Sequence, residues 1–309
     1  MLNRLETKLI TRAGIFFLIL ILLMLFFGRI VYAEVVEAVY SRSYDIPEDT
    51  ELFIFGDSHA ATGLNPDFIK NSVSLAVLSE PLYYTKYRIQ QWYKRKNIKN
   101  VILSLSYHNI SDKKADEIYG IPFIDRYYYF VLDEKFPVKS VKQYLMYLLG
   151  ELKFRCGIPI FGKNYFSSYV FESEERFVDM GYYLYQHVDL SKEMTFQILD
   201  LLYDKNTKVS EFYIQCIKDI AEYCKENNIS LNVISTPLRD DYIAGVPEAI
   251  KLSFEQLMED MITDYNVSYY DFRHYAERDD EYIDADHLNF EGAIKFSKEI
   301  AEWIVVRGE

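Results

Sequence analysis

A run of four apolar residues that ends in a polar turn constrains the fold of this chain more than any other stretch. Residues 52–55 read Leu-Phe-Ile-Phe, and Gly56, Asp57 and Ser58 follow directly. An unbroken apolar run of this length is typical of a strand buried on both faces of a parallel sheet. Because the polar turn ends the run, Ser58 is expected at the carboxyl end of a strand. In open α/β sheets, that edge is where ligands bind.

A second motif near the far end of the chain supplies partners for this serine. Residues 284–287 read Asp-Ala-Asp-His, and an amphipathic helix is predicted after them. A serine becomes a nucleophile when a histidine base reaches it and a carboxylate orients that base. The sequence therefore offers Ser58, His287 and Asp284 as a candidate catalytic triad. Asp286 is the weaker orienter, because a residue adjacent to the histidine normally points its side chain elsewhere.

Together the two motifs resemble those of the SGNH (GDSL-like) hydrolase superfamily, in which a Gly-Asp-Ser block opens the domain and an Asp-x-x-His block closes it. The resemblance covers these motifs and not the whole chain. It implies a flavodoxin-like three-layer α/β sandwich with a parallel sheet, and an enzyme that forms an acyl-serine through a Ser-His-Asp triad. The alternative is a turn serine together with an Asp-x-x-His that only caps a helix.

The order of the predicted elements agrees with this α/β fold. Helical patterns at 81–96, 210–227 and 247–264 alternate with short apolar or β-branched runs, which favours a parallel sheet with helices between its strands. The five predicted strands are 52–55, 72–77, 101–105, 231–235 and 267–272. Residues 111–208 interrupt this rhythm and are predicted to form an aromatic-rich insertion, helical in part around 141–152. Its tyrosines could stack against sugar rings or pack on the core.

The resemblance also implies an oxyanion hole with contributions from two strand ends. The family donates a backbone N–H from a glycine after the second strand, where Ser79 is the nearest match in this chain. An N–H can serve from any residue except proline, so the backbones of Ser58 and Ser79 are predicted donors. After the third strand the family carries an asparagine. Asn109 fits by type, whereas His108 lies nearer the family position.

Two residues are candidates for binding the substrate. His108 is one, if Asn109 completes the oxyanion hole. Arg239 is the other, because it follows the fourth predicted strand and so lies at the same edge of the sheet. Its guanidinium could bind an anionic group, or it could pair with Asp240 or Asp241 nearby.

A metal centre is the competing interpretation of the two motifs. Asp57 and His59, with Asp284 and His287, would supply ligands of the types that bind zinc. That arrangement does not explain why a serine lies between the first two residues. No metal and no cofactor are therefore predicted, with Asp57 capping the turn and His59 incidental.

The N-terminal residues carry the pattern of a membrane anchor. Residues 13–28 contain no charge, and the apolar character resumes at 30–33. Together these stretches approach the roughly 20 residues that span a bilayer. Because Arg4, Lys8 and Arg12 precede them, the positive-inside rule keeps the N-terminus cytoplasmic.

This pattern predicts a single-pass protein of the cell membrane. Residues 1–33 would be the cytoplasmic leader and transmembrane anchor, and residues 34–309 an extracytoplasmic domain that carries the insertion. The small residues at 31–33 leave a cleaved signal peptide as the alternative. Both alternatives place the catalytic motifs outside the cytoplasm.

Charge and cysteine content exclude some partners and linkages. The net charge of −13 argues against nucleic acid, because a phosphate-binding surface needs a surplus of Lys and Arg. Cys216 and Cys224 lie eight residues apart on one predicted helix, which places their α-carbons beyond disulfide reach. Buried free thiols are predicted, although Cys156 could pair with either.

The resemblance implies two reactions that share an acyl-serine, namely ester hydrolysis and acyl transfer to a carbohydrate hydroxyl. Membrane-anchored members with a sparse Gly-Asp-Ser-His block resemble proteins that acetylate secreted or cell-wall polysaccharides. A membrane-bound O-acyltransferase supplies the acyl group to such proteins. O-acetyl transfer to a polysaccharide is therefore the predicted function. A carbohydrate esterase is one alternative, and a catalytically silent subunit of a polysaccharide-synthesis complex, which the missing glycine supports, is the other.

Overall fold

The computed structural model describes residues 8–23, 26, 46–113, 141, 144–145, 177–179, 182–183, 189–275 and 279–307. The chain divides into two compact units. Residues 46–118 and 173–309 make up the unit that contains the sheet, and residues 1–45 and 119–172 make up the other.

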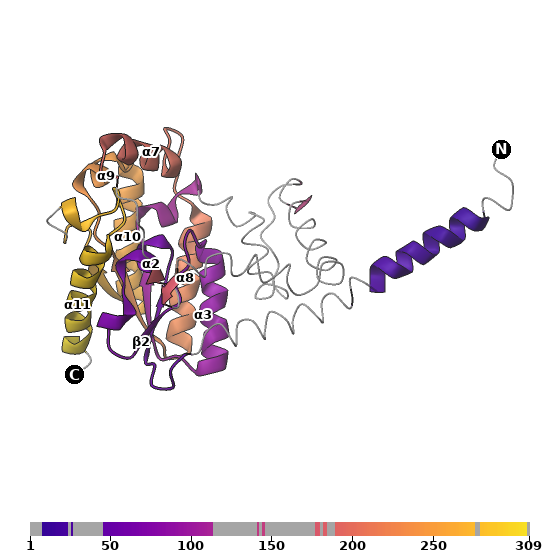
Figure 1. Ribbon diagram of the computed structural model, residues 1–309, viewed down its shortest axis with the longest axis horizontal. Helices are drawn as coiled ribbons and strands as arrows, with labels where there is room; N and C mark the ends of the chain where they lie inside the picture. The colour runs from indigo at the N-terminus through magenta and orange to yellow at the C-terminus, as the bar shows by residue number, and fades with distance from the viewer. Residues whose placement is uncertain are drawn as a thin grey trace. The chain divides into compact units, whose positions relative to one another are not determined.

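Five parallel strands form the central sheet (Figure 1). They are β1 (Leu52–Phe55), β2 (Ser72–Ser74), β3 (Asn100–Ser104), β6 (Ser230–Ser235) and β7 (Ser268–Asp271). Their order across the sheet is β2-β1-β3-β6-β7, and each neighbouring pair is parallel. The chain steps from β1 to one side and then crosses to the other, which is the doubly wound arrangement predicted from the sequence. Such folds bind their ligands at the switch point, here between β1 and β3.

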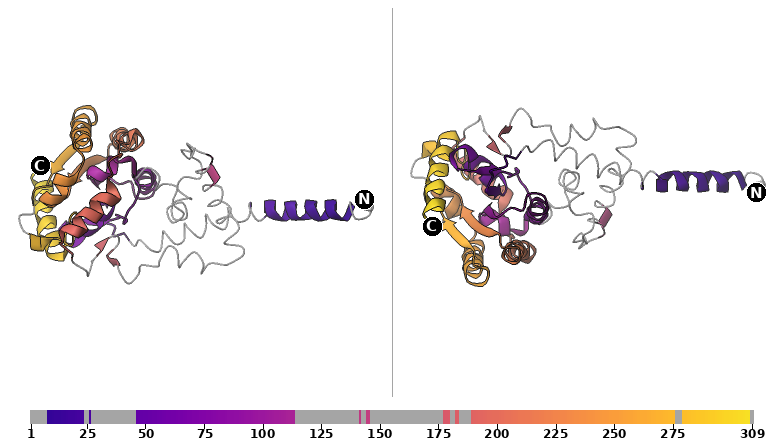
Figure 2. Two further views of the ribbon diagram at one scale, coloured as in Figure 1. Left: turned by 90° about the horizontal axis from the view of Figure 1, so that it is seen from above. Right: turned by 90° about the horizontal axis from the view of Figure 1, so that it is seen from below.

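Helices cover both faces of the sheet (Figures 1 and 2). One face carries α3 (Leu82–Lys96), α8 (Glu211–Glu226) and α10 (Glu248–Tyr265), and the other carries α2 (Ser58–Gly63) and α11 (Phe290–Arg307). Alternate residues of β1 point to opposite faces. Leu52 and Ile54 belong to a core cluster with Ala61 of α2, whereas the Phe55 ring lies under Arg88 of α3. The three-layer α/β sandwich is therefore confirmed.

Local signals place the helices close to their predicted bounds. The Ser210 hydroxyl accepts a hydrogen bond from the Tyr213 N–H at 3.3 Å and so caps the start of α8. Asn97 and Asn266 end α3 and α10 in the left-handed conformation, with φ angles of 50° and 58°. Asparagine is one of the few residues that adopts this conformation at a helix end.

The two ends of the predicted insertion lie next to each other. Ser111 and Val209 form an antiparallel bridge, and the Asp112 N–H donates to the Lys208 carbonyl at 2.9 Å. The described parts between them include the antiparallel strands β4 (Phe177–Asp179) and β5 (Tyr182–Tyr183) and the helix α7 (Lys192–Leu202). Most of the predicted helix at 141–152 lies outside the described residues. Strand β5 lies next to α2, so part of the insertion borders the helix that begins with Ser58.

The N-terminal residues that the structure describes are helical from 8 to 23. Their large apolar side chains are exposed, among them Leu9, Ile15 and Phe16. Across the described part of the chain, no helix has both the length and the apolar composition needed to cross a membrane. The transmembrane anchor stays a prediction, and the junction at residues 27–45 lies outside the described residues.

Two of the three cysteines are free and buried, as predicted. Cys216 and Cys224 both lie on α8. Burial raises the pKa of each thiol to about 12, so both stay protonated and unreactive at neutral pH. Cys156 lies outside the described residues.

Gly56, between β1 and α2, is required by both its conformation and its surroundings. Its φ angle is 143°, and a Cβ there would lie 3.0 Å from Ala60 Cβ and 3.1 Å from Ser104 Cβ. We expect Gly56→Ala to lower the free energy of unfolding by about 1–3 kcal/mol, which a thermal melt would record as a lower Tm. Gly63→Ala is the matched control, because a Cβ there meets nothing closer than Thr236 Cγ2 at 3.6 Å. Equal melting temperatures for the two variants would contradict this account.

Candidate active site at the strand ends

The turn after β1 presents Ser58 at the carboxyl edge of the sheet. The Asp57 carboxylate accepts a hydrogen bond from the His59 N–H at 3.0 Å and caps α2, as predicted. Ser58 is the first residue of that helix and is half-buried. The N–H groups of a first helical turn have no acceptor within the helix, so the Ser58 N–H is available to a developing negative charge.

The loop that carries His287 is closed by backbone hydrogen bonds. Tyr282 and Leu288 form an isolated antiparallel bridge, and the Ile283 N–H donates to the His287 carbonyl at 2.9 Å. Asp284 Oδ1 accepts the His287 N–H at 2.9 Å. These bonds hold the His287 loop in its conformation without any contribution from Ser58.

The three predicted triad residues meet at hydrogen-bond distances. His287 Nε2 lies 2.8 Å from Ser58 Oγ, and Nδ1 lies 3.0 Å from both carboxylate oxygens of Asp284. Asp286 Oδ1 lies 3.1 Å from the same Nδ1, so the expectation that this side chain points elsewhere was wrong. Carboxylate oxygens only accept, which means that Nδ1 carries the proton. The lone pair of the neutral ring is then on Nε2, where it can take the Ser58 proton.

Two carboxylates around one imidazole make His287 a strong base. Burial lowers its pKa, but the charge and close contact of Asp286 and the hydrogen bond that Nδ1 donates to Asp284 outweigh burial and hold the pKa well above 6.5. The ring is a base only when it is unprotonated. Activity that depends on His287 is therefore expected to rise with pH through a pKa above 6.5, and to fall as the ring protonates below it.

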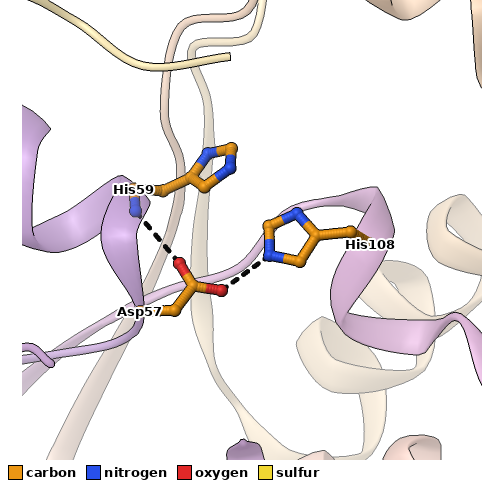
Figure 3. Close-up of side chains that lie close together, drawn as sticks. All are labelled: Asp57, His59 and His108. Atoms are coloured by element: carbon orange, nitrogen blue, oxygen red, sulfur yellow. Dashed lines mark hydrogen bonds and ion pairs between the residues drawn. The ribbon is translucent and has the colours of Figure 1, made fainter. Parts of the chain in front are cut away.

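A second set of polar side chains lies close together and includes Asp57, His59 and His108 (Figure 3). Asp57 Oδ2 lies 2.6 Å from His108 Nε2 and 2.8 Å from Asn109 Nδ2. Burial opposes ionisation of Asp57, but the charge and hydrogen bond of His108, with help from His59 and Asn109, hold its pKa well below the usual value. Asp57 therefore stays a buried carboxylate across the physiological pH range.

His59 is part of this network, and the expectation that it is incidental was wrong. It is 2% exposed, and its ring centroid lies 4.7 Å from that of His108 and 5.0 Å from that of His287. His59 Nδ1 lies 3.1 Å from Thr236 Oγ1, and Nε2 lies 3.3 Å from Asp286 Oδ2. His59 thus connects α2 to the loop that carries His287.

Two of the three predicted oxyanion residues line one small hollow. Ser79 and Asn109 line it together with Leu82 and Tyr213. The Asn109 amide donates to Asp57, and its oxygen accepts the Ser106 N–H at 2.7 Å, so this side chain is engaged within the protein. Stabilisation of an oxyanion by Ser79 and Asn109 stays a prediction.

The backbone of Ser79 has a conformation that suits the glycine expected from the resemblance. Its φ angle is 56°, a left-handed conformation that glycine adopts without the steric cost that other residues incur. Ser79 nonetheless keeps its N–H. The departure from the family therefore changes the residue type and leaves the glycine-like backbone conformation in place.

The two predicted substrate-binding residues are held by protein groups. Arg239 donates to the Leu190 carbonyl at 3.0 Å and pairs with Asp241 at 3.3 Å, so the pairing alternative holds for its guanidinium. His108 is 4% exposed and lines the hollow while bonded to Asp57. Contact of either residue with substrate stays a prediction.

Two groups of side chains each bring three potential metal ligands within 4.8 Å of one another. One is Asp57, His59 and His108, and the other is His59, Asp286 and His287. These atoms already face one another as hydrogen-bond or ion-pair partners, such as His108 Nε2 and Asp57 Oδ2. In this structure, the carboxylates and imidazoles of both groups therefore contact one another directly.

Sequence reasoning missed Asp286, His59 and Thr236 as parts of the site. The signal for Asp286 was its place beside His287, but the side-chain direction depends on how the closed loop turns. Thr236 could have been found from its position directly after β6, at the same sheet edge as Ser58.

Comparisons with known proteins find structural likenesses and no sequence match. No known family and no curated protein matches the sequence, but eighteen chains of solved structures match the fold. One is a candidate acylhydrolase from Bacteroides fragilis, with 9% identity, a TM-score of 0.44 and coverage of 88% of this chain and 96% of that one. Another is a GDSL-like lipase from Bacteroides thetaiotaomicron, with 10% identity, a TM-score of 0.44 and coverage of 90% and 100%. These likenesses are too distant to carry an argument about activity, which depends on the geometry of the site.

The conformation of Ser79 predicts the effect of restoring glycine. Ser79→Gly removes a steric cost of about 1–2 kcal/mol but adds chain entropy to the unfolded state, so we expect a net gain in stability of up to about 1 kcal/mol. The N–H is retained, so activity should persist. Ser72→Gly, at a strand position of β2, is the matched control and should lower the Tm. If both variants lower the Tm equally, the left-handed conformation of Ser79 is not the cause.

Proposed function

We propose that the chain is a serine-dependent acyl-transfer enzyme. The observation that carries this proposal is the contact of His287 Nε2 with Ser58 Oγ at 2.8 Å, with Nδ1 bound by carboxylates. A base in this tautomer and at this distance activates a serine hydroxyl. A silent subunit has no need of such an arrangement, so the contact favours an enzyme.

In the first half-reaction, Ser58 Oγ attacks the carbonyl carbon of an acyl donor while its proton moves to His287 Nε2. The negative charge that forms on the carbonyl oxygen would be met by the N–H groups of Ser58 and Ser79. His287 then gives its proton to the leaving group, and the acyl-serine remains. In the second half-reaction, His287 takes the proton of an incoming hydroxyl, whose oxygen attacks the acyl carbon. The bond from that carbon to Ser58 Oγ breaks, and His287 returns the proton to Ser58 Oγ.

The acyl group is proposed to be small, namely acetyl. We take the acyl-binding space to be the small hollow beside Asp57, the residue before Ser58, because the buried side chains of Leu82 and Tyr213 bound this hollow and leave it room for a short chain. A long acyl chain would require these two residues to move from the core.

The acceptor is proposed to be a carbohydrate hydroxyl of a secreted or cell-wall polysaccharide. Strand β5 of the aromatic-rich insertion lies next to α2, which brings a Tyr-containing segment to the helix of Ser58.

The donor is proposed to be a membrane-bound O-acyltransferase. Support comes from the helix at residues 8–23, whose apolar side chains are exposed and suit a lipid environment.

Substitutions of the triad test the proposed chemistry. We expect Ser58→Ala and His287→Ala each to reduce turnover of p-nitrophenyl acetate by roughly 10⁴–10⁶ without a loss of fold. Asp284→Asn should cost less, because Asp286 also contacts the imidazole. A fluorophosphonate probe should label the wild type and Ser253→Ala, a control on α10, but not Ser58→Ala. Labelling that does not depend on Ser58 would exclude the proposed nucleophile.

The identity of the acceptor is tested by measuring where the acyl group goes. We expect the full chain, given an acetyl ester and oligosaccharides, to form acetylated sugar in excess of free acetate. Free acetate in excess would instead identify a carbohydrate esterase.

In cells, an exported chain without residues 1–33 should hydrolyse small esters and fail to modify polymer, because a membrane donor would no longer be held beside it. Full modification by that chain would contradict a membrane-bound donor.

A further inference from the structure

The catalytic imidazole has more acidic neighbours than a single orienting carboxylate. Building on the proposed function, we propose that Asp286 is a second positioning carboxylate for His287, and that His59 holds Asp286 in place from the opposite side. The two residues would act through His287 and not through contact with substrate, because His59 is 2% exposed and Asp286 is 3% exposed.

The two oxygens of Asp286 face different imidazoles. Oδ1 lies 3.1 Å from His287 Nδ1, and Oδ2 lies 3.3 Å from His59 Nε2. The first contact comes from the same loop, whereas the second crosses to α2. The His59 contact has the length of an ion pair but is not aligned as a hydrogen bond. A carboxylate shared in this way cannot turn without losing one of its partners.

The partners of His59 determine which of its two ring nitrogens carries the proton. Nε2 faces a carboxylate oxygen, which only accepts, so Nε2 carries the proton. Nδ1 is then an acceptor, and the Thr236 hydroxyl at 3.1 Å can donate to it. Thr236, at the end of β6, therefore fixes His59 in the tautomer that supports Asp286.

Burial makes these contacts necessary. A carboxylate removed from water is costly unless hydrogen-bond donors or cations compensate for its charge, and removal of a partner leaves that cost in place. Burial opposes ionisation of Asp286, but the charge and close contacts of His287 and His59 outweigh it and hold its pKa well below the usual value. Asp286 thus stays charged while His287 gains and loses its proton.

Other polar and titratable groups of the described residues also face this network. Asp284 and Ser58 face His287, the backbone N–H of His59 donates to Asp57 at 3.0 Å, and the ring centroid of His108 lies 4.7 Å from that of His59. Tyr203 and Tyr242, joined through their hydroxyls at 3.3 Å, lie near enough for the charge of Asp286 to raise the pKa of each, in addition to burial. Both phenols stay neutral at working pH, so His287 and His59 are the groups that balance Asp286.

This arrangement predicts opposite effects for the two positioning residues. Asp286→Asn removes a negative charge next to His287 and should lower the pKa of that imidazole by about one unit or more. His59→Leu removes the donor that competes for Asp286, which leaves the carboxylate to His287 alone and should raise that pKa. His59→Gln keeps a donor N–H near the Nε2 position and should restore the wild-type value.

The experiment is an NMR titration of the full chain with isotope-labelled histidine. The chain has five histidines, and His287→Gln identifies the resonance of His287. Asp57→Asn is the matched control, because Asp57 is an equally buried carboxylate that pairs with His108 and does not touch His287. The Asp57→Asn substitution should move the pKa of His287 by less than half of the shift that Asp286→Asn causes. Thermal melts establish that each variant is folded.

The outcomes separate this inference from the proposed function. The inference is supported if the pKa of His287 shifts in opposite directions in Asp286→Asn and His59→Leu. The acidic limb of the profile of kcat/KM against pH should shift in the same two directions. An unchanged pKa of His287 in either folded variant, or an equal shift in Asp57→Asn, overturns it. If Asp286→Asn does not fold, the upward shift in His59→Leu and its reversal in His59→Gln still decide the matter. Failure of the proposed function would instead appear as a wild-type protein without Ser58-dependent turnover, whatever the titration shows.

Discussion

Pairing of buried carboxylates with imidazoles is the interaction on which this site depends. Asp57 and Asp286 are almost wholly removed from water, which is costly unless their charges are compensated. Asp57 is compensated by His108 and Asn109 from the turn after β3, and Asp286 by His59 from α2 and His287 from the closing loop. The pairing of Asp57 with His108 and Asn109 and the pairing of Asp286 with His59 each cross from one segment to another. The strand ends are therefore joined by charge and hydrogen bonding as well as by the sheet.

Much of the fold could be predicted from the sequence because its signals are local. The apolar run of β1, the Ser210 cap of α8 and the asparagine at the end of α3 each specify an element boundary without reference to distant residues. The strand order follows from the alternation of strands and helices. The path of the insertion could not be predicted in the same way, because its ends are fixed by hydrogen bonds between residues about a hundred positions apart, such as Asp112 and Lys208.

In the candidate site too, residues in short motifs could be predicted from the sequence, whereas residues with distant partners could not. Ser58, His287 and Asp284 could be found because each stands in a short motif, and the structure brings them into contact. His59 could not be assigned a role from its position next to Ser58, because its partners are Thr236 and Asp286, which lie far away in the chain. The expectation for Asp286 failed for a related reason. The rule that adjacent side chains diverge applies to regular structure, and residues 283–287 form a tight loop.

The absence of the family glycine does not by itself favour a silent subunit. Ser79 adopts the left-handed backbone that glycine would provide, and the residue after it explains how this strain is held. The Glu80 carboxylate is buried and accepts hydrogen bonds from Thr85 at 3.0 Å and Arg88 at 2.5 Å, while its N–H donates to Val77. A turn anchored by a buried ion pair can keep a serine in this conformation. The N–H that an oxyanion requires is thereby retained, so whether the chain is an enzyme is decided by the reactivity of Ser58 and not by the residue type at position 79.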